Sequence, residues 1–132
     1  MVIADSNAWI DYFRNLASPT VQTLADLIRT RRVAIVGIVL AEILRGARSE
    51  DELADLKVGL RGARYLEMTA PAWERAGLIA RTLDLEGKPI PLADMIIAGF
   101  ALEHDHEVLT RDHHFERIPD LKLYQPKGGA DV

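Results

Sequence analysis

Residues 91–102 read PLADMIIAGFAL, an apolar stretch that carries one charged side chain, Asp94. The segment is apolar all the way round a helical wheel, which is typical of a helix buried at the centre of a protein. Burying an unpaired carboxylate costs several kcal/mol, roughly 5 or more. We therefore expect Asp94 to have a partner, and the residues around this helix indicate what kind of partner it is.

Short apolar runs alternate along the chain with longer helical patterns. We expect strands at residues 2–4, 32–36, 65–68, 107–110 and 121–124. We expect helices at residues 8–14, from 19 onward, 38–47, 50–62, 69–86 and 92–104. Strands this apolar are buried on both faces, which indicates a parallel sheet with helices on each side. The predicted fold class is therefore α/β, a three-layer α/β/α sandwich around a central, mainly parallel sheet.

Length and composition limit what the protein can be. The chain has 132 residues and a formal net charge of −4, and we expect a single domain over 1–132 with a flexible tail at 125–132. The absence of cysteine excludes disulfides, thiolate zinc sites and a cysteine nucleophile. The longest apolar run, at 33–41, is far shorter than the ~20 residues of a membrane-spanning helix. We expect a soluble, cytoplasmic protein with no membrane partner.

Four acidic residues differ from the many solvated acids on helical faces: Asp5, Glu42, Asp94 and Asp112. Asp5 and Asp112 follow predicted strands, whereas Glu42 and Asp94 lie near the starts of predicted helices. Binding sites in open parallel sheets form outside the carboxyl ends of the strands. We therefore expect four carboxylates from four separate segments to converge on one edge of the sheet.

Each of these acids also has a simpler interpretation. Asp5 is a good N-cap for the helix that follows it, and Asp94 favours the positive end of its helix dipole by only about 0.3–1 kcal/mol. Glu42 flanks an apolar stripe and could point sideways toward Arg45 or water, and Asp112 could be an ordinary loop acid. The coincidence of all four acids at one edge favours a shared site.

Four carboxylates in one cleft repel each other unless they are protonated or bridged by cations. Oxygen ligands without cysteine or a histidine pattern indicate Mg²⁺ or Mn²⁺, with one or two ions in the site. Such a site suits phosphodiester hydrolysis, in which one ion activates water and a second, roughly 3.5–4 Å away, stabilises the leaving oxygen. We expect in-line attack that leaves a 5′-phosphate and a 3′-hydroxyl.

Four segments in this order resemble the motifs of the PIN-domain ribonucleases, in particular the VapC toxins of bacterial toxin–antitoxin pairs. The segments are VIADSNAWIDYF (2–13), AEILRGA (41–47), PLADMIIAGFALEH (91–104) and VLTRDHHFERI (108–118). The resemblance extends over nearly the whole chain, since these segments are spread from residue 2 to residue 118. One such motif alone is weak, but four with family-like spacing are specific.

The resemblance implies a magnesium-dependent endoribonuclease that forms a homodimer and is inhibited by a cognate antitoxin covering the cleft. The metal acids of the family correspond to Asp5, Glu42, Asp94 and Asp112, and Asp112 occupies the most variable of these positions. Ser6 lies where the family often uses a hydroxyl to hold the first acid. RNA as the substrate, the antitoxin and the dimer all come from the resemblance and not from the residues themselves.

Three other functions can be compared with the sequence by the residues that each requires. A receiver-like signalling domain needs an adjacent acidic pair after the first strand, and Ser6-Asn7 follows Asp5 instead. An aspartate-nucleophile phosphatase needs an acid at position 7. A catalytically weak PIN-like domain that mainly binds a partner is the remaining alternative, and the presence of all four acids argues against it.

Two further clusters have open roles. Trp9, Tyr12 and Phe13 share one face of a predicted helix, as expected of either a core stripe or part of an antitoxin groove. His113 and His114 are expected to be a solvated loop pair, because no transition-metal spacing surrounds them.

Three arginines lie near the predicted acids in sequence: Arg45, Arg48 and Arg111. They could bind RNA phosphates or balance the charge of the carboxylates, and the sequence does not separate these roles.

Overall fold

The structure is a computed structural model that describes residues 1–126. The segment 125–132 is the predicted flexible tail, and all of it after residue 126 lies outside this range. Within the range, no helix is both long enough and apolar enough to cross a membrane.

Strands and helices alternate along the described chain, as the sequence predicts. The elements are β1 (Val2–Ala4), α1 (Ser6–Phe13), α2 (Pro19–Arg29), β2 (Val33–Val36), α3 (Gly37–Arg45), α4 (Glu50–Gly59), η1 (Leu60–Gly62), β3 (Arg64–Leu66), α5 (Ala70–Leu85), α6 (Leu92–His104), β4 (Glu107–Leu109) and η2 (His113–Arg117), where η denotes a 3-10 helix. Three helices begin at predicted polar caps, since the side chains of Ser18, Ser49 and Thr69 each accept a hydrogen bond from the first turn that follows.

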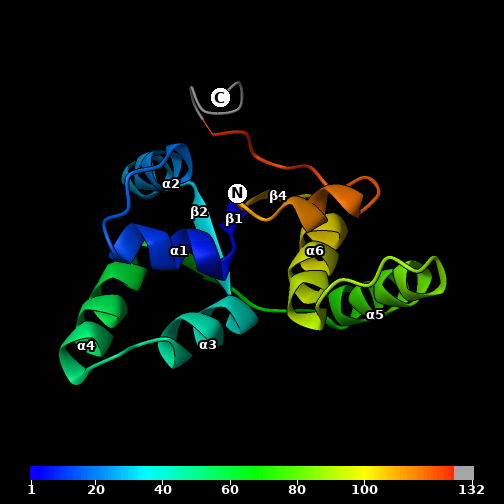
Figure 1. Ribbon diagram of the computed structural model, residues 1–132, viewed down its shortest axis with the longest axis horizontal. Coiled ribbons are helices and arrows are strands. Elements are labelled where there is room, and N and C mark those ends of the chain that lie inside the picture. Colours follow the sequence, from blue (N-terminus) through cyan, green and yellow to red (C-terminus); the bar gives the residue numbers. More distant parts are fainter. Residues whose placement is uncertain (127–132) are drawn as a thin grey trace.

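The four strands form one parallel sheet in the order β3-β2-β1-β4. Helices α1, α2 and α4 lie on one side of it, and α5 and α6 lie on the other (Figure 1). Strands β1 and β2 are buried throughout. The three-layer α/β/α sandwich with a parallel sheet is therefore confirmed.

Two strand predictions need correction. The edge strand β3 spans Arg64–Leu66 instead of 65–68, and its first two residues are exposed. The predicted strand at 121–124 is reduced to a single parallel bridge between Leu123 and Val108. At this bridge the N–H of Val108 donates to the carbonyl of Lys122 at 2.9 Å, and the carbonyl of Val108 accepts the N–H of Tyr124 at 2.8 Å.

The strand order places a switch point between β1 and β4. From β1 the chain crosses to β2 and then β3 on one side, whereas β4 pairs with the opposite edge of β1. Crevices that bind ligands form at the carboxyl ends of strands where the winding reverses in this way. The backbone N–H of Asp5 donates to the carbonyl of Leu109 at 3.0 Å, which joins the ends of these two strands.

Helix α6 is the buried central helix that the sequence predicts. Every residue from Met95 to Ala101 is buried. It packs very closely on α5, because a Cβ at Gly99 would lie 2.7 Å from the Cβ of Ala76. This tight packing fixes the start of α6, and therefore Asp94, against the rest of the fold.

Candidate metal centre

Asp5 directly follows β1 and is 2% exposed. One carboxylate oxygen accepts the backbone N–H of Asn7 at 2.8 Å, which makes Asp5 the N-cap of α1, as its simpler interpretation holds. The other oxygen accepts the hydroxyl of Thr110 at 2.6 Å. The carboxylate therefore joins the end of β1 to the loop after β4.

The pKa of Asp5 is raised to about 6, chiefly because burial disfavours the charged form. The hydrogen bonds from Thr110 and Asn7 lower this pKa, whereas the negative charges of Asp112 and Asp94 raise it. Three acids from distant segments therefore lie within electrostatic reach of one another.

Asp112 is held in place by two neighbours of Asp5. Its carboxylate accepts the side-chain amide of Asn7 at 2.6 Å, and its backbone N–H donates to the hydroxyl oxygen of Thr110 at 3.0 Å. Asn7 and Thr110 thus each contact both acids, and the sequence analysis identified neither of them. Asn7 could have been predicted from the sequence. An asparagine two residues after a site acid can donate its backbone N–H to that acid and its side-chain amide to a second one.

A third connection fixes the same loop. The guanidinium Nε of Arg111 donates to the carboxylate of Asp11 at 2.8 Å, and Asp11 lies one helical turn after Asn7 on α1. Arg111 therefore balances the charge of a buried acid that is not one of the four predicted. Arg48 pairs with Glu52, whereas Arg45 is exposed and forms no ion pair within residues 1–126.

Asp94 lies in the first turn of α6, with 16% of its side chain exposed. Its carboxylate lies 2.5 Å from Nε2 of His114. Burial raises the pKa of Asp94, the contact with His114 lowers it, and the charge of Asp112 raises it. Asp94 thus has a partner, although the partner present here is a side chain that the sequence analysis set aside.

The prediction of a solvated histidine pair is right for His113 and wrong for His114. The side chain of His113 is 90% exposed, whereas that of His114 is only 26% exposed. The difference arises because the next residue, Phe115, is fully buried and fixes the rotation of the η2 turn.

One ligand atom from each of Asp94, Asp112 and His114 lies within 4.8 Å of the other two. The side-chain oxygen of Asn7 is buried and has no hydrogen-bond partner among the described residues. An unpaired buried acceptor is costly, and water or a cation would satisfy it. Carboxylate and amide oxygens with one imidazole nitrogen make a donor set that suits a divalent cation.

Glu42 and Ser6 are not tied to this group. Glu42 lies on α3 and is half-buried, and its side chain makes no hydrogen bond or ion pair with the part of the chain that the structure describes. Ser6 is the first residue of α1 and is also half-buried. The metal-binding role of Glu42 and the supporting role of Ser6 stay predictions.

The aromatic residues on α1 fit a core stripe at one position and a partly exposed groove at the other two. Trp9 is fully buried, as a core residue should be. Tyr12 and Phe13 are half-buried. Phe13 lines a small hollow between α1, α3 and α4 together with Ile10 and Leu56. The hypothesis of an antitoxin groove is therefore limited to Tyr12 and Phe13.

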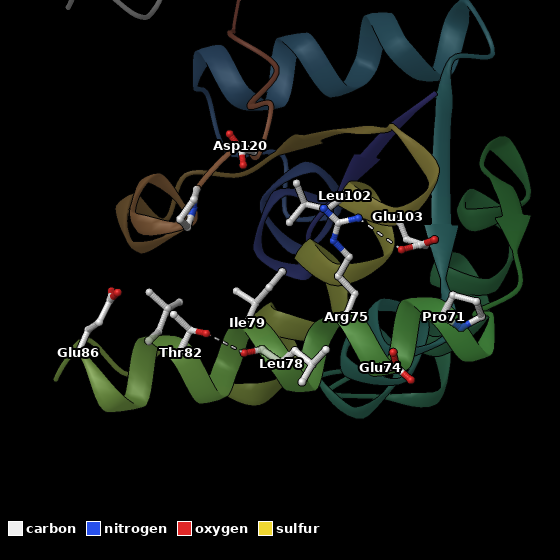
Figure 2. A pocket seen from close by; sticks show the side chains of 12 residues that line it. Pro71, Glu74, Arg75, Leu78, Ile79, Thr82, Glu86, Leu102, Glu103 and Asp120 are labelled. Atoms are coloured by element: carbon white, nitrogen blue, oxygen red, sulfur yellow. Dashed lines mark hydrogen bonds and ion pairs between the residues drawn. The ribbon is translucent and has the colours of Figure 1, made fainter.

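A separate cavity of about 540 Å³ lies beside α5 and contains none of the predicted site residues. Figure 2 shows Leu78 and Thr82 of α5 on its wall, and Arg75 paired with Glu103 of α6 at 3.4 Å. Its size alone does not make it the reaction site, because the clustered acids with raised pKa lie elsewhere.

Comparisons with known proteins agree with this geometry. The profile of the PIN domain family matches residues 2–121. The chain is 27% identical to Ribonuclease VapC11 of Mycobacterium tuberculosis over 129 residues, covering 95% of this chain and 96% of the relative.

Solved structures give the same result. The DNA-bound VapBC structure from Salmonella typhimurium is 26% identical, with a TM-score of 0.82 over 93% of this chain and 96% of that chain. A toxin–antitoxin complex from Klebsiella pneumoniae shares the fold at 23% identity, with a TM-score of 0.76 over 96% and 98% of the two chains.

Proposed function

The chain belongs to the PIN domain family, and from this membership we propose that it is the toxin of a toxin–antitoxin pair, acting as a metal-dependent endoribonuclease. The observation that carries the proposal is the meeting of Asp5, Asp94 and Asp112 at the switch point of the sheet. RNA is the proposed substrate because the curated relative is named a ribonuclease.

We assign the metal to the carboxylates of Asp5, Glu42, Asp94 and Asp112, with Mg²⁺ or Mn²⁺ as the ion and one or two ions in the site. A divalent cation bound there would activate water for attack on phosphorus and offset the charge that develops on the phosphate oxygens. Asn7 and Thr110 orient Asp5 and Asp112. The pairing of Arg111 with Asp11 keeps the loop after β4 against α1, so the acids are positioned before substrate arrives.

The proposed protein partner is a cognate VapB-type antitoxin, as the resemblance to VapC toxins implies and the matched VapBC structures support. We also propose a homodimer. Large apolar side chains are exposed on α5 and at the start of α6, where a second copy could cover them; they are Trp73, Leu78, Leu85 and Leu92. A dimer would require these side chains to form one contiguous apolar patch, as interaction surfaces typically do.

The competing proposal is a catalytically weak domain that mainly binds its partner. It predicts that the acids can be replaced without loss of function, since partner binding would not need a clustered negative charge. The raised pKa of Asp5 and of Asp94 argues against it, because acids with perturbed pKa values that lie together are typical of catalytic sites.

Incubation of the purified, antitoxin-free chain with a mixture of structured RNAs tests the activity. We expect endonucleolytic products with 5′-phosphate ends in Mg²⁺ or Mn²⁺ and intact RNA in EDTA, because the carboxylates alone repel a phosphodiester. End-group analysis of the products distinguishes this chemistry from contaminating ribonucleases that use the 2′-hydroxyl and leave 3′-phosphates. Intact RNA in both metals, with a protein that melts cooperatively, would contradict the proposal.

A further inference from the structure

The orientation of His114 distinguishes it from its neighbour. It belongs to the short η2 turn, whose position is fixed by the fully buried Phe115, and its ring lies 5.2 Å from the Phe115 ring at 31°. The adjacent His113 is turned to solvent, and within residues 1–126 its side chain pairs with Glu116 alone, at 3.5 Å. One of two neighbouring histidines is thus built into the acidic centre, and the other is not.

We propose that the imidazole of His114 is a direct ligand of the metal centre and gives it a preference for Mn²⁺ over Mg²⁺. This inference rests on the proposed function, because it assigns a further residue to the same centre. It adds a nitrogen donor to a site that the four acids alone would make entirely oxygen.

The distances among Asp94, Asp112 and His114 support His114 as a metal ligand. Ligands bound to a small divalent cation lie about 2.0–2.2 Å from it, so two of them facing each other across the ion are roughly 4.0–4.4 Å apart. Atoms of Asp94, Asp112 and His114 already lie within 4.8 Å of one another, and only small side-chain movements are needed to enclose an ion.

The contact between His114 and Asp94 places an imidazole nitrogen directly beside a proposed metal-binding carboxylate. At 2.5 Å, Nε2 and the carboxylate oxygen are closer than two adjacent ligands on one ion, which would be about 3 Å apart. Both atoms could bind one divalent cation after a small movement of the imidazole ring away from the carboxylate.

The donor set determines which ion is favoured. Mg²⁺ is a hard ion that prefers oxygen ligands and retains several waters, whereas imidazole nitrogen suits first-row transition ions. Asp94 and Asp112 supply oxygen, and His114 supplies the nitrogen. The sequence contains no cysteine, so a thiolate does not draw the site toward zinc. Mn²⁺ accepts this mixed set and still tolerates the octahedral, partly hydrated coordination that the acids provide.

Pulsed electron paramagnetic resonance of the Mn²⁺-loaded full chain tests the assignment directly. We expect nitrogen hyperfine coupling from a bound imidazole in the wild type and in His113→Ala, and none in His114→Ala. His113→Ala is the matched control, because the two histidines are adjacent and only one faces the acids. Should His114→Ala fold poorly, absence of nitrogen coupling in the wild type overturns the assignment, and coupling that persists in His113→Ala supports it.

Calorimetric titration gives a second readout that does not depend on cleavage. We expect His114→Ala to bind Mn²⁺ at least about 100-fold more weakly, because loss of an outer-shell partner already costs about 10–100-fold. We expect His114→Asp to bind Mg²⁺ at least as well as the wild type while losing the preference for Mn²⁺. Mn²⁺ binding without nitrogen coupling, or unchanged affinity in His114→Ala, would overturn the role of His114 and leave the proposed function standing. Failure of the wild type to bind either ion would overturn both.

Discussion

Asp94→Asn is expected to reduce RNA cleavage by at least about 100-fold while leaving the fold intact. Loss of a residue that only orients a metal ligand already costs about 10–100-fold, so loss of a proposed direct ligand should exceed that range. Asparagine has nearly the same shape as aspartate and keeps one oxygen. The effect should therefore come from the lost charge and not from altered packing of the tightly held α6.

The measurement is the single-turnover rate of cleavage of a 5′-labelled RNA in Mg²⁺, together with a thermal melt of each variant. Asp84→Asn is the matched control, because it makes the same chemical change on an exposed position of α5. The control should cleave at the wild-type rate. Cleavage by Asp94→Asn within a few-fold of that rate would remove Asp94 from the mechanism.

Asp5→Asn is expected to stabilise the metal-free protein at neutral pH by about 1–3 kcal/mol. The pKa of Asp5 is about 6 in the folded chain and 3.8 in a free side chain, and each unit of difference corresponds to about 1.4 kcal/mol. Burial is the main cause, with repulsion by Asp112 and Asp94 a smaller one. Asparagine should keep the N-cap bond to Asn7 while removing the buried charge.

The gain should depend on pH in a defined direction. Between pH 3.8 and about 6 the folded state binds more protons at Asp5 than the unfolded state does, so the wild type loses stability as pH rises through this window. The variant does not titrate there. Its advantage should be full above about pH 6, shrink as pH falls, and vanish near pH 4.

Thermal melts in EDTA at pH 4 and pH 7.5 check both statements, and the expected rise in melting temperature at pH 7.5 is about 3–10 °C. Added Mn²⁺ should reverse the order, because the cation stabilises only a chain that binds it. A melting temperature below that of the wild type at pH 7.5 in EDTA would mean that the Asp5 carboxylate supports the fold instead of being held there for a ligand.

Local patterns predict the fold well where burial and capping act along the chain. Helix α6 begins and ends where its sequence predicts, because Pro91 precedes an apolar run that only a central helix can bury. Asp5 and Asp112 lie at one sheet edge because chain direction in a parallel sheet fixes which ends of the strands meet. Residues 121–124 look like a strand by composition, but composition does not determine how many residues pair, and this segment forms a single bridge with Val108.

The sequence is less informative about side chains whose direction depends on packing elsewhere. His113 and His114 are equivalent in local sequence, and only the burial of Phe115 decides which ring meets Asp94. Asn7 and Thr110 contact the acids across about one hundred positions of sequence. Glu42 lies on the predicted helix, but the helical pattern does not determine whether its side chain points toward the other acids.

A crystal of the protein soaked in Mn²⁺ and measured at the manganese absorption edge tests most directly whether distant carboxylates jointly hold a divalent cation. We predict an anomalous peak about 2–2.5 Å from carboxylate oxygens of Asp94 and Asp112, on the side of the crevice where Asp5 ends β1. Fully ionised acids at neutral pH with no peak among them, or a peak bound only by acids outside this group, would contradict the account.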